Sequence, residues 1–117
     1  MKNLFTEIDQ TIRKEKLYAD AELKRSTIMQ RFKISRHRLY ALLAIHTGGL
    51  SFPQYINTIR MAETKQLLTK HPEWTVDSVG AQVGLCAPNL RRLFKETYGI
   101  TPGAYRAQMG FSVRGKK

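Results

Sequence analysis

The chain has 117 residues, 42% of them hydrophobic, which suits one domain or two very small ones with a modest core but not a large active-site cavity. Its 20 Lys and Arg against 9 Asp and Glu give a net charge of +11, which predicts attraction to polyanions without choosing among DNA, RNA and anionic lipid. One cysteine excludes an intrachain disulfide and a Cys-rich zinc site, and no signal-like or membrane-length apolar run occurs, so we expect a cytoplasmic protein without membrane contact.

Apolar residues recur every three or four positions, and no run alternates like a β-strand, so the sequence predicts an all-α fold with seven helices. Ser35, Thr75 and Thr101 are good N-cap residues, and SFPQ at 51–54 has the spacing of a capping box. The predicted helices cover about residues 3–17, 25–32, 36–46, 51–70, 75–83, 87–97 and 101 onward.

The chain contains an internal repeat. LYALL at 39–43 and LRRLF at 90–94 are offset by 51 residues, and each follows a short predicted helix and a tight turn. One residue has been gained in the first copy or lost in the second, between positions 43 and 55 of the first copy, because a later matched pair has a smaller offset. Further matched pairs are Gly48 with Gly99 at an offset of 51 and Tyr55 with Tyr105 at an offset of 50.

Both copies have the spacing of a helix-turn-helix unit. A small residue lets two helices cross closely, the next position turns the chain, and two leucines bury the second helix against the first. These positions are Gly80, Gly84, Leu90 and Leu93 in the second copy and Met29, Lys33, Leu39 and Leu42 in the first. We therefore predict helix-turn-helix subdomains at 1–50 and 71–117, the latter with a basic tail, joined by a long connecting helix at 51–70.

The second helix of each unit is a candidate recognition helix with a cationic outer face. Arg can donate two hydrogen bonds to guanine, Asn can pair with adenine, and an exposed Tyr or Ala can touch a thymine methyl. Base contact is expected foremost for Arg36, His37, Arg91 and Arg92, and the alternative for each is a phosphate contact or none. The candidate DNA-binding residues are Arg36, His37, Arg38, Tyr40, Ala41, Pro88, Asn89, Arg91, Arg92 and Lys95.

Two long segments lack acidic residues, which predicts a basic face. None occurs between Glu22 and Glu63, where Arg60 lies, or after Glu96, where Arg106 lies. The alternative is that such charge runs are merely solvated. The segregation still favours an anionic partner over a neutral one.

The stretch SRHR at 35–38 is the most informative part of the first segment without acidic residues. Ser35 begins a helix whose first turn holds Arg36, His37 and Arg38, close to the positive end of the helix dipole, where cations are unfavourable. An anion outside the chain would compensate, and the phosphates and guanine edges of a major groove fit this role. A connecting helix of about 18 residues spans roughly 27 Å, comparable to the ~34 Å between successive major grooves, so one chain could read a non-palindromic site.

The sequence resembles the DNA-binding region of AraC/XylS transcriptional regulators over about residues 20 to 107. The resemblance rests on YINTIRMAETKQLL at 55–68, VDSVGAQVG at 76–84 and FKETYGITPGAYR at 94–106. It implies seven helices with two helix-turn-helix units, and a bacterial, nucleoid-associated regulator of transcription, usually an activator that contacts RNA polymerase. The chain departs from the family at Gly80, usually alanine, and at Cys86, where a Ser or Asn cap is expected. The resemblance also implies either a region excised from a longer regulator or a stand-alone form.

Other classes of function are less well supported. His37, His46 and His71 share no metal-ligand spacing and no catalytic constellation occurs, so we expect no metal, cofactor, small-molecule site or enzymatic activity. Cys86 is expected to be an inert buried thiol. The remaining alternatives are a non-specific nucleic-acid-binding module and a protein-interaction adaptor that uses the helix-turn-helix shape.

Overall fold

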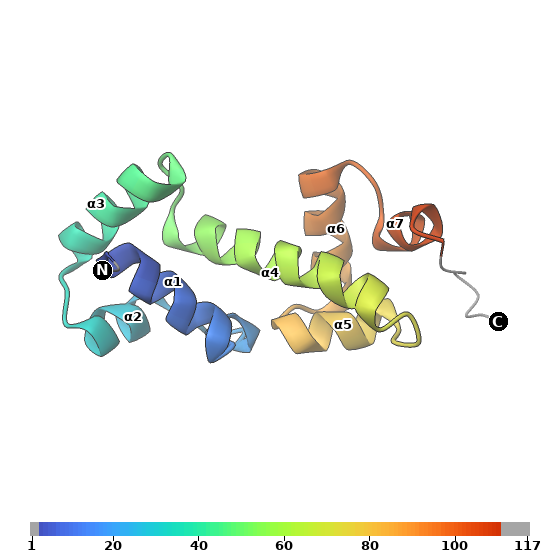
Figure 1. Cartoon of the computed structure of the whole chain (residues 1–117), viewed down its shortest axis with the longest axis horizontal. Helices are drawn as coiled ribbons and strands as arrows, with labels where there is room; N and C mark the ends of the chain where they lie inside the picture. Colours follow the sequence, from blue (N-terminus) through green and yellow to red (C-terminus); the bar gives the residue numbers. More distant parts are fainter. Residues whose placement is uncertain (1–2, 111–117) are drawn as a thin grey trace. The chain divides into compact units, whose positions relative to one another are not determined.

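The computed structural model describes residues 3–110, and within this range the chain forms seven α-helices, one short 3-10 helix and no β-strand (Figure 1). The all-α fold with seven α-helices is therefore confirmed. The predicted basic tail lies mostly beyond residue 110 and so outside the described residues. In chain order the elements are α1 (Leu4–Lys14), η1 (Leu17–Ala19), α2 (Arg25–Phe32), α3 (Arg36–Thr47), α4 (Phe52–Lys70), α5 (Val76–Val83), α6 (Ala87–Tyr98) and α7 (Pro102–Gln108).

Side-chain caps fix where four of these helices begin, as the sequence predicted. Ser35, Thr75 and Thr101 each accept a hydrogen bond from the backbone N–H three residues on, at 3.0, 3.0 and 3.1 Å. At the start of α4 the capping box is complete: the Gln54 N–H donates to the Ser51 hydroxyl at 3.3 Å, and the Ser51 N–H donates to Gln54 Oε1 at 3.0 Å. Each such cap stabilises its helix by about 1 kcal/mol.

The first helix is shorter than predicted. It ends at Lys14, because Lys16 adopts the left-handed conformation with φ 56° and the chain turns into η1. Residues 13–20 contain no glycine or proline, so no strong local signal in the sequence marks this turn. The helix buries Ile8 and Ile12 on its inner face.

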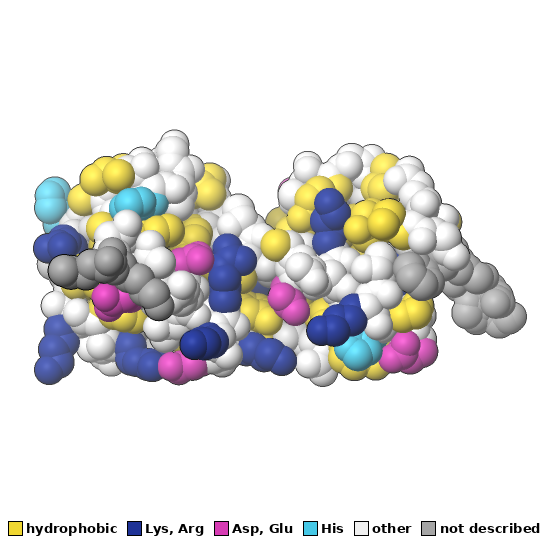
Figure 2. All heavy atoms as spheres, in the orientation of Figure 1, with side chains coloured by type: hydrophobic (Ala, Val, Ile, Leu, Met, Phe, Trp, Pro, Cys, Tyr) yellow, Lys and Arg dark blue, Asp and Glu magenta, His cyan; other side chains and the backbone are white. Residues whose placement is uncertain are grey.

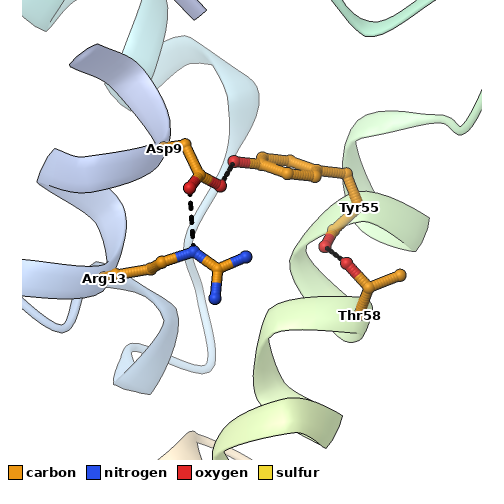
Figure 3. Close-up of polar contacts among 4 residues, drawn as sticks. All are labelled: Asp9, Arg13, Tyr55 and Thr58. Carbon is orange, nitrogen blue, oxygen red and sulfur yellow. Dashed lines mark hydrogen bonds and ion pairs between the residues drawn. The ribbon is translucent and has the colours of Figure 1, made fainter. Parts of the chain in front are cut away.

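The chain divides into two compact units, Met1–Ile59 and Arg60–Lys117, with the boundary inside α4. In the first unit a polar cluster joins α1 to the start of α4: the Tyr55 hydroxyl donates to Asp9, which also accepts from Arg13 Nε at 2.9 Å (Figure 3). Burial, helped by the Asp9 carboxylate, raises the pKa of Tyr55, so this phenol stays a donor. The apolar core of the unit includes Ile8, Ile12, Ile28, Leu39, Leu43, Phe52 and Ile56.

The second unit contains a buried arginine that the sequence placed on the surface. Arg106 of α7 is only 7% exposed, and it donates from Nε to the Leu68 carbonyl at 2.8 Å and from its terminal nitrogen to the His71 carbonyl at 3.0 Å. These bonds satisfy backbone acceptors near the end of α4. The expectation that Arg106 belongs to a basic face was wrong, and so was that for Arg60, which is 9% exposed. The apolar core of this unit includes Leu68, Val79, Val83, Leu90 and Phe94.

The internal repeat is exact at the level of helix boundaries. The helices α2 and α5 each have 8 residues, α3 and α6 each have 12, and all four boundaries are offset by 51. The next helices begin at Phe52 and Pro102, offset by 50, so the extra residue of the first copy lies between Gly48 and Phe52. Each copy is thus one helix-turn-helix unit followed by the start of another helix.

Candidate nucleic-acid interface

The first helix-turn-helix unit consists of α2 and α3. Lys33 makes the turn in the left-handed conformation with φ 55°, and the Ile34 N–H donates to the Met29 carbonyl at 3.0 Å. Leu39 and Leu43 bury the inner face of α3, at 1% and 2% exposure. The local folding is therefore the one that the spacing predicted, with a strained residue at the position where glycine is more usual.

The outer face of α3 carries the five candidate residues of the first unit, and all of them are exposed. Within residues 3–110, Arg36 and Arg38 take part in no ion pair, so the first turn of α3 is an uncompensated cationic surface. In the space-filling view, basic and histidine side chains lie next to each other at the edge where α3 begins (Figure 2). The exposed candidates are Arg36, His37, Arg38, Tyr40 and Ala41.

The second unit consists of α5 and α6. Gly84 makes the turn with φ 81°, and the inner face of α6 is fully buried at Leu90 and Phe94. Gly80 is a point of close approach, because a Cβ built there would lie 2.6 Å from the Leu85 carbonyl oxygen. The structure thus requires a small residue at that position, but for a different reason than the predicted helix crossing. The limiting contact is the turn itself, and Leu90 of α6 is the next nearest neighbour, at 3.6 Å.

The outer face of α6 carries the other five candidates, and they are exposed as well. Two arginines there have partners that the sequence analysis missed: Arg91 lies 3.3 Å from Asp77 of α5, and Arg92 lies 3.6 Å from Glu96. Glu96 stands four residues after Arg92, a spacing that signals such a pair, whereas the contact with Asp77 depends on the fold. The exposed candidates are Pro88, Asn89, Arg91, Arg92 and Lys95.

Cys86 differs from the prediction. It occupies the N-cap position of α6, where it is exposed and its side chain makes no cap hydrogen bond, so the expectation of a buried thiol was wrong. The reason is geometric: the matched position in the first unit is Ser35, and an N-cap side chain turns back over the helix end at the surface.

Two further properties bear on what the interface can do. No group of His, Cys, Asp and Glu able to hold a metal ion occurs among the residues that the structure describes. Over the same residues, no helix is long and apolar enough to cross a bilayer.

Comparison with known proteins shows which class of protein this chain resembles. Residues 28–108 match a family model described as a helix-turn-helix domain. The chain is 31% identical over 87 residues to the uncharacterized HTH-type transcriptional regulator YpdC of Escherichia coli (strain K12), covering 74% of this chain and 30% of YpdC. The matched part thus spans less than a third of that curated relative.

Two solved structures have the same fold. One is the DNA-binding domain of AdpA in complex with a target DNA, with a TM-score of 0.79 and 22% identity over 99% of this chain and 97% of that chain. The other is a regulator of Chromobacterium violaceum described as AraC-type, with a TM-score of 0.73 and 22% identity over 92% of this chain and 97% of that chain. At these identities, the likeness concerns the fold.

Because the family model covers well over half of the chain, the chain belongs to this helix-turn-helix family. Its type is the AraC type, which confirms the resemblance carried by FKETYGITPGAYR at 94–106. The expected class of function for this chain, DNA binding in the regulation of transcription, is confirmed with it.

Proposed function

We propose that the chain reads a specific double-stranded DNA site with two recognition helices, α3 and α6, placed in successive major grooves. The observation that carries this is the duplication: two units with matching helix boundaries each bury one face of the second helix and expose the other. The DNA complex of the AdpA domain supports the same use of the fold. In this proposal the helix-turn-helix subdomains occupy 1–50 and 71–117, and residues 51–70 connect them.

The electrostatics of α3 support an anionic partner. Its first turn carries Arg36 and Arg38, which have no ion pair within residues 3–110, beside the positive helix terminus. Without a bound anion, cations beside the positive end of the helix dipole are electrostatically unfavourable. Phosphate oxygens or guanine acceptors would remove this electrostatic penalty when DNA binds. Arg36 and His37 are proposed to reach base edges, and Arg38 to contact phosphate.

The exposed face of α6 is proposed to complete the site. Arg91 and Arg92 can each donate two hydrogen bonds to a guanine, Asn89 can pair with adenine, and Lys95 can contact phosphate. The helix α4 has 19 residues, about 28 Å at 1.5 Å per residue, which is compatible with a separation of one turn of DNA. Two different faces in one chain suit a non-palindromic site.

The role of the whole protein is a further part of the proposal. As the family resemblance implies, the chain acts in bacterial cytoplasm, on the nucleoid, and activates transcription by bringing RNA polymerase to the promoter. The exposed surfaces outside α3 and α6 remain accessible to such a partner when both helices lie in DNA.

The test is a comparison of affinities. Purified chain is titrated against a duplex selected from a randomised library and against random duplex, at several salt concentrations. We expect the selected duplex to bind about 10³-fold more tightly or better, and affinity to fall steeply with salt as counterions are released. Equal affinity for both duplexes would favour a non-specific nucleic-acid-binding module, and no affinity for either would favour a protein adaptor.

A further inference from the structure

The bodies of the two recognition helices carry opposite chemistry at matched positions. At four outward positions of α3 the side chains are apolar or aromatic, whereas the residues 51 positions later in α6 are all charged. The first turns show the reverse, since the residues matched to Arg36, His37 and Arg38 of α3 are the uncharged Ala87, Pro88 and Asn89 of α6. The four matched pairs are Tyr40 with Arg91, Ala41 with Arg92, Ala44 with Lys95, and Ile45 with Glu96.

The apolar side chains of α3 form one continuous row. Positions 40, 41, 44 and 45 lie together on the helix surface, because residues three and four apart are neighbours there: 41 adjoins 44 and 45, and 40 adjoins 44. Ile45 is 74% exposed and Tyr40 is 46% exposed, and they are two of the three large hydrophobic side chains exposed among residues 3–110. A single exposed isoleucine is ordinary, but two large side chains flanking two alanines on one face form an exposed apolar patch. At its edge the Arg25 guanidinium lies over the Tyr40 ring, 5.9 Å from the ring centre.

We infer that this row, defined as Tyr40, Ala41, Ala44 and Ile45, reads thymine methyl groups. The inference rests on the proposed function, which places α3 in a major groove. The only apolar group that base pairs present there is the thymine C5-methyl, and a short apolar side chain can approach it closely. The charged body of α6 cannot do this, and suits guanine acceptors and phosphates instead.

The chain therefore has a site with two unlike halves. The half under α3 requires thymine methyls along the body of the helix, next to a phosphate or guanine contact at its first turn. The half under α6 requires guanine at the body of the helix. The methyl contacts come from shape and burial, so the loss of affinity caused by removing a methyl group should depend weakly on salt. The contacts that the cations of both helices make with DNA should depend strongly on salt.

The experiment uses the full chain and a duplex that it selects from a randomised library. Each thymine is replaced singly by deoxyuridine, which removes only the methyl group and keeps every hydrogen-bonding atom. We expect one or two replacements, confined to one half, to weaken binding by about fourfold each, the transfer value of one buried methyl. Replacing guanine by 7-deazaguanine should weaken binding in the other half, because it removes the N7 acceptor.

Variants assign the effect to a helix. In Ile45→Ala, at least one deoxyuridine replacement should no longer change affinity, since its contact is already lost. Glu96→Ala, at the matched position of α6, should keep full sensitivity to deoxyuridine. Both side chains are exposed, so both variants should retain the thermal midpoint and helical circular dichroism of the parent.

The outcomes separate the two proposals. An enriched duplex that tolerates every deoxyuridine replacement, or that contains no thymine, overturns the methyl contacts and leaves specific DNA binding in place. Deoxyuridine effects that persist unchanged in Ile45→Ala at every thymine also overturn the assignment to α3. A library in which no sequence is enriched overturns both the methyl contacts and the proposed function.

Discussion

The turn and the cap before the recognition helix differ between the two helix-turn-helix units. In the first unit Lys33 makes the turn at φ 55°, a conformation that costs a non-glycine residue about 1 to 2 kcal/mol, and Ser35 then caps α3. In the second unit Gly84 makes the turn without that cost, and Cys86 leaves α6 without a side-chain cap. Each unit therefore has one good and one poor local signal. Buried apolar residues at matched positions, Leu39 with Leu90 and Leu43 with Phe94, hold the same backbone in both.

The arginines of the two recognition helices also differ in their surroundings. Arg36 has no ion-pair partner within residues 3–110, whereas Arg91 lies 3.3 Å from Asp77. An arginine that already has a carboxylate must give up or share that contact before it binds DNA. The comparison predicts that α3 contributes more to affinity per arginine than α6.

The largest expected effect is on DNA affinity in Arg36→Ala. We expect Arg36→Ala and Arg91→Ala each to cost about 1 to 3 kcal/mol on the selected duplex, with Arg36→Ala the larger, and to relax preference at bases about one helical turn apart. Titration against duplexes with single base changes measures both effects. Lys14→Ala, which removes an exposed cation of α1, is the control for net charge alone. A uniform loss on every sequence would mean that both arginines touch only phosphate.

A somewhat smaller effect is expected on stability in Gly80→Ala. Alanine is the better helix former by about 1 kcal/mol, but its Cβ would lie 2.6 Å from the Leu85 carbonyl oxygen, which is backbone and cannot move away cheaply. We therefore expect a net loss of about 1 to 2 kcal/mol in the free energy of unfolding, measured by denaturant titration.

Gly103→Ala in α7 is the matched control for this prediction. Nothing lies within 4 Å of a Cβ built at Gly103, so only helix propensity acts there and stability should rise or stay unchanged. A gain of stability in Gly80→Ala as large as that in Gly103→Ala would show that the turn at Leu85 relaxes freely.

Local signals in the sequence predicted most of the fold. The caps at Ser35, Ser51, Thr75 and Thr101 depend on residues three positions apart, and the repeat at an offset of 51 needed only pattern matching. The predictions about the fold that failed concern residues whose burial depends on contacts distant in the sequence. The burial of Arg106 arises from carbonyls 38 and 35 residues earlier, and no local pattern distinguishes it from an exposed arginine.

For the candidate site, too, the sequence predicted what depends on local pattern and missed what depends on the fold. Helical periodicity placed all ten candidates on exposed faces, because burial of one face determines the other. It left out Ile45, which is more exposed than Tyr40 on the same helix, and it could not show that Asp77 reaches Arg91 across the two helices of the unit. The repeat contained the signal for Ile45, since its matched residue is the charged Glu96.

A third prediction exchanges the caps of the two units. Ser35→Ala should lower the free energy of unfolding by about 1 kcal/mol, because it removes the acceptor of the Arg38 N–H, and Cys86→Ser should raise it by a similar amount, because serine can cap α6 as Ser35 caps α3. Denaturant midpoints of the two single variants and of the double variant measure both changes. The double variant should return close to the parent, since the two caps lie in separate units. No gain in Cys86→Ser would mean that the start of α6 cannot accept the cap geometry found in α3.

The smallest expected effect concerns Asp77. Its exposed ion pair with Arg91 contributes only about 0.2 to 1 kcal/mol, and its carboxylate also favours the N-terminal turn of α5, so Asp77→Asn should lower stability slightly. The same change frees Arg91 and removes a negative charge near the proposed DNA surface, so affinity for the selected duplex should rise by up to about fivefold. Glu22→Gln makes the same change of charge at an exposed site of the first unit and should give a smaller gain. If Asp77→Asn binds no better than Glu22→Gln, the carboxylate does not compete with DNA for Arg91, and the lower contribution expected from α6 needs another cause.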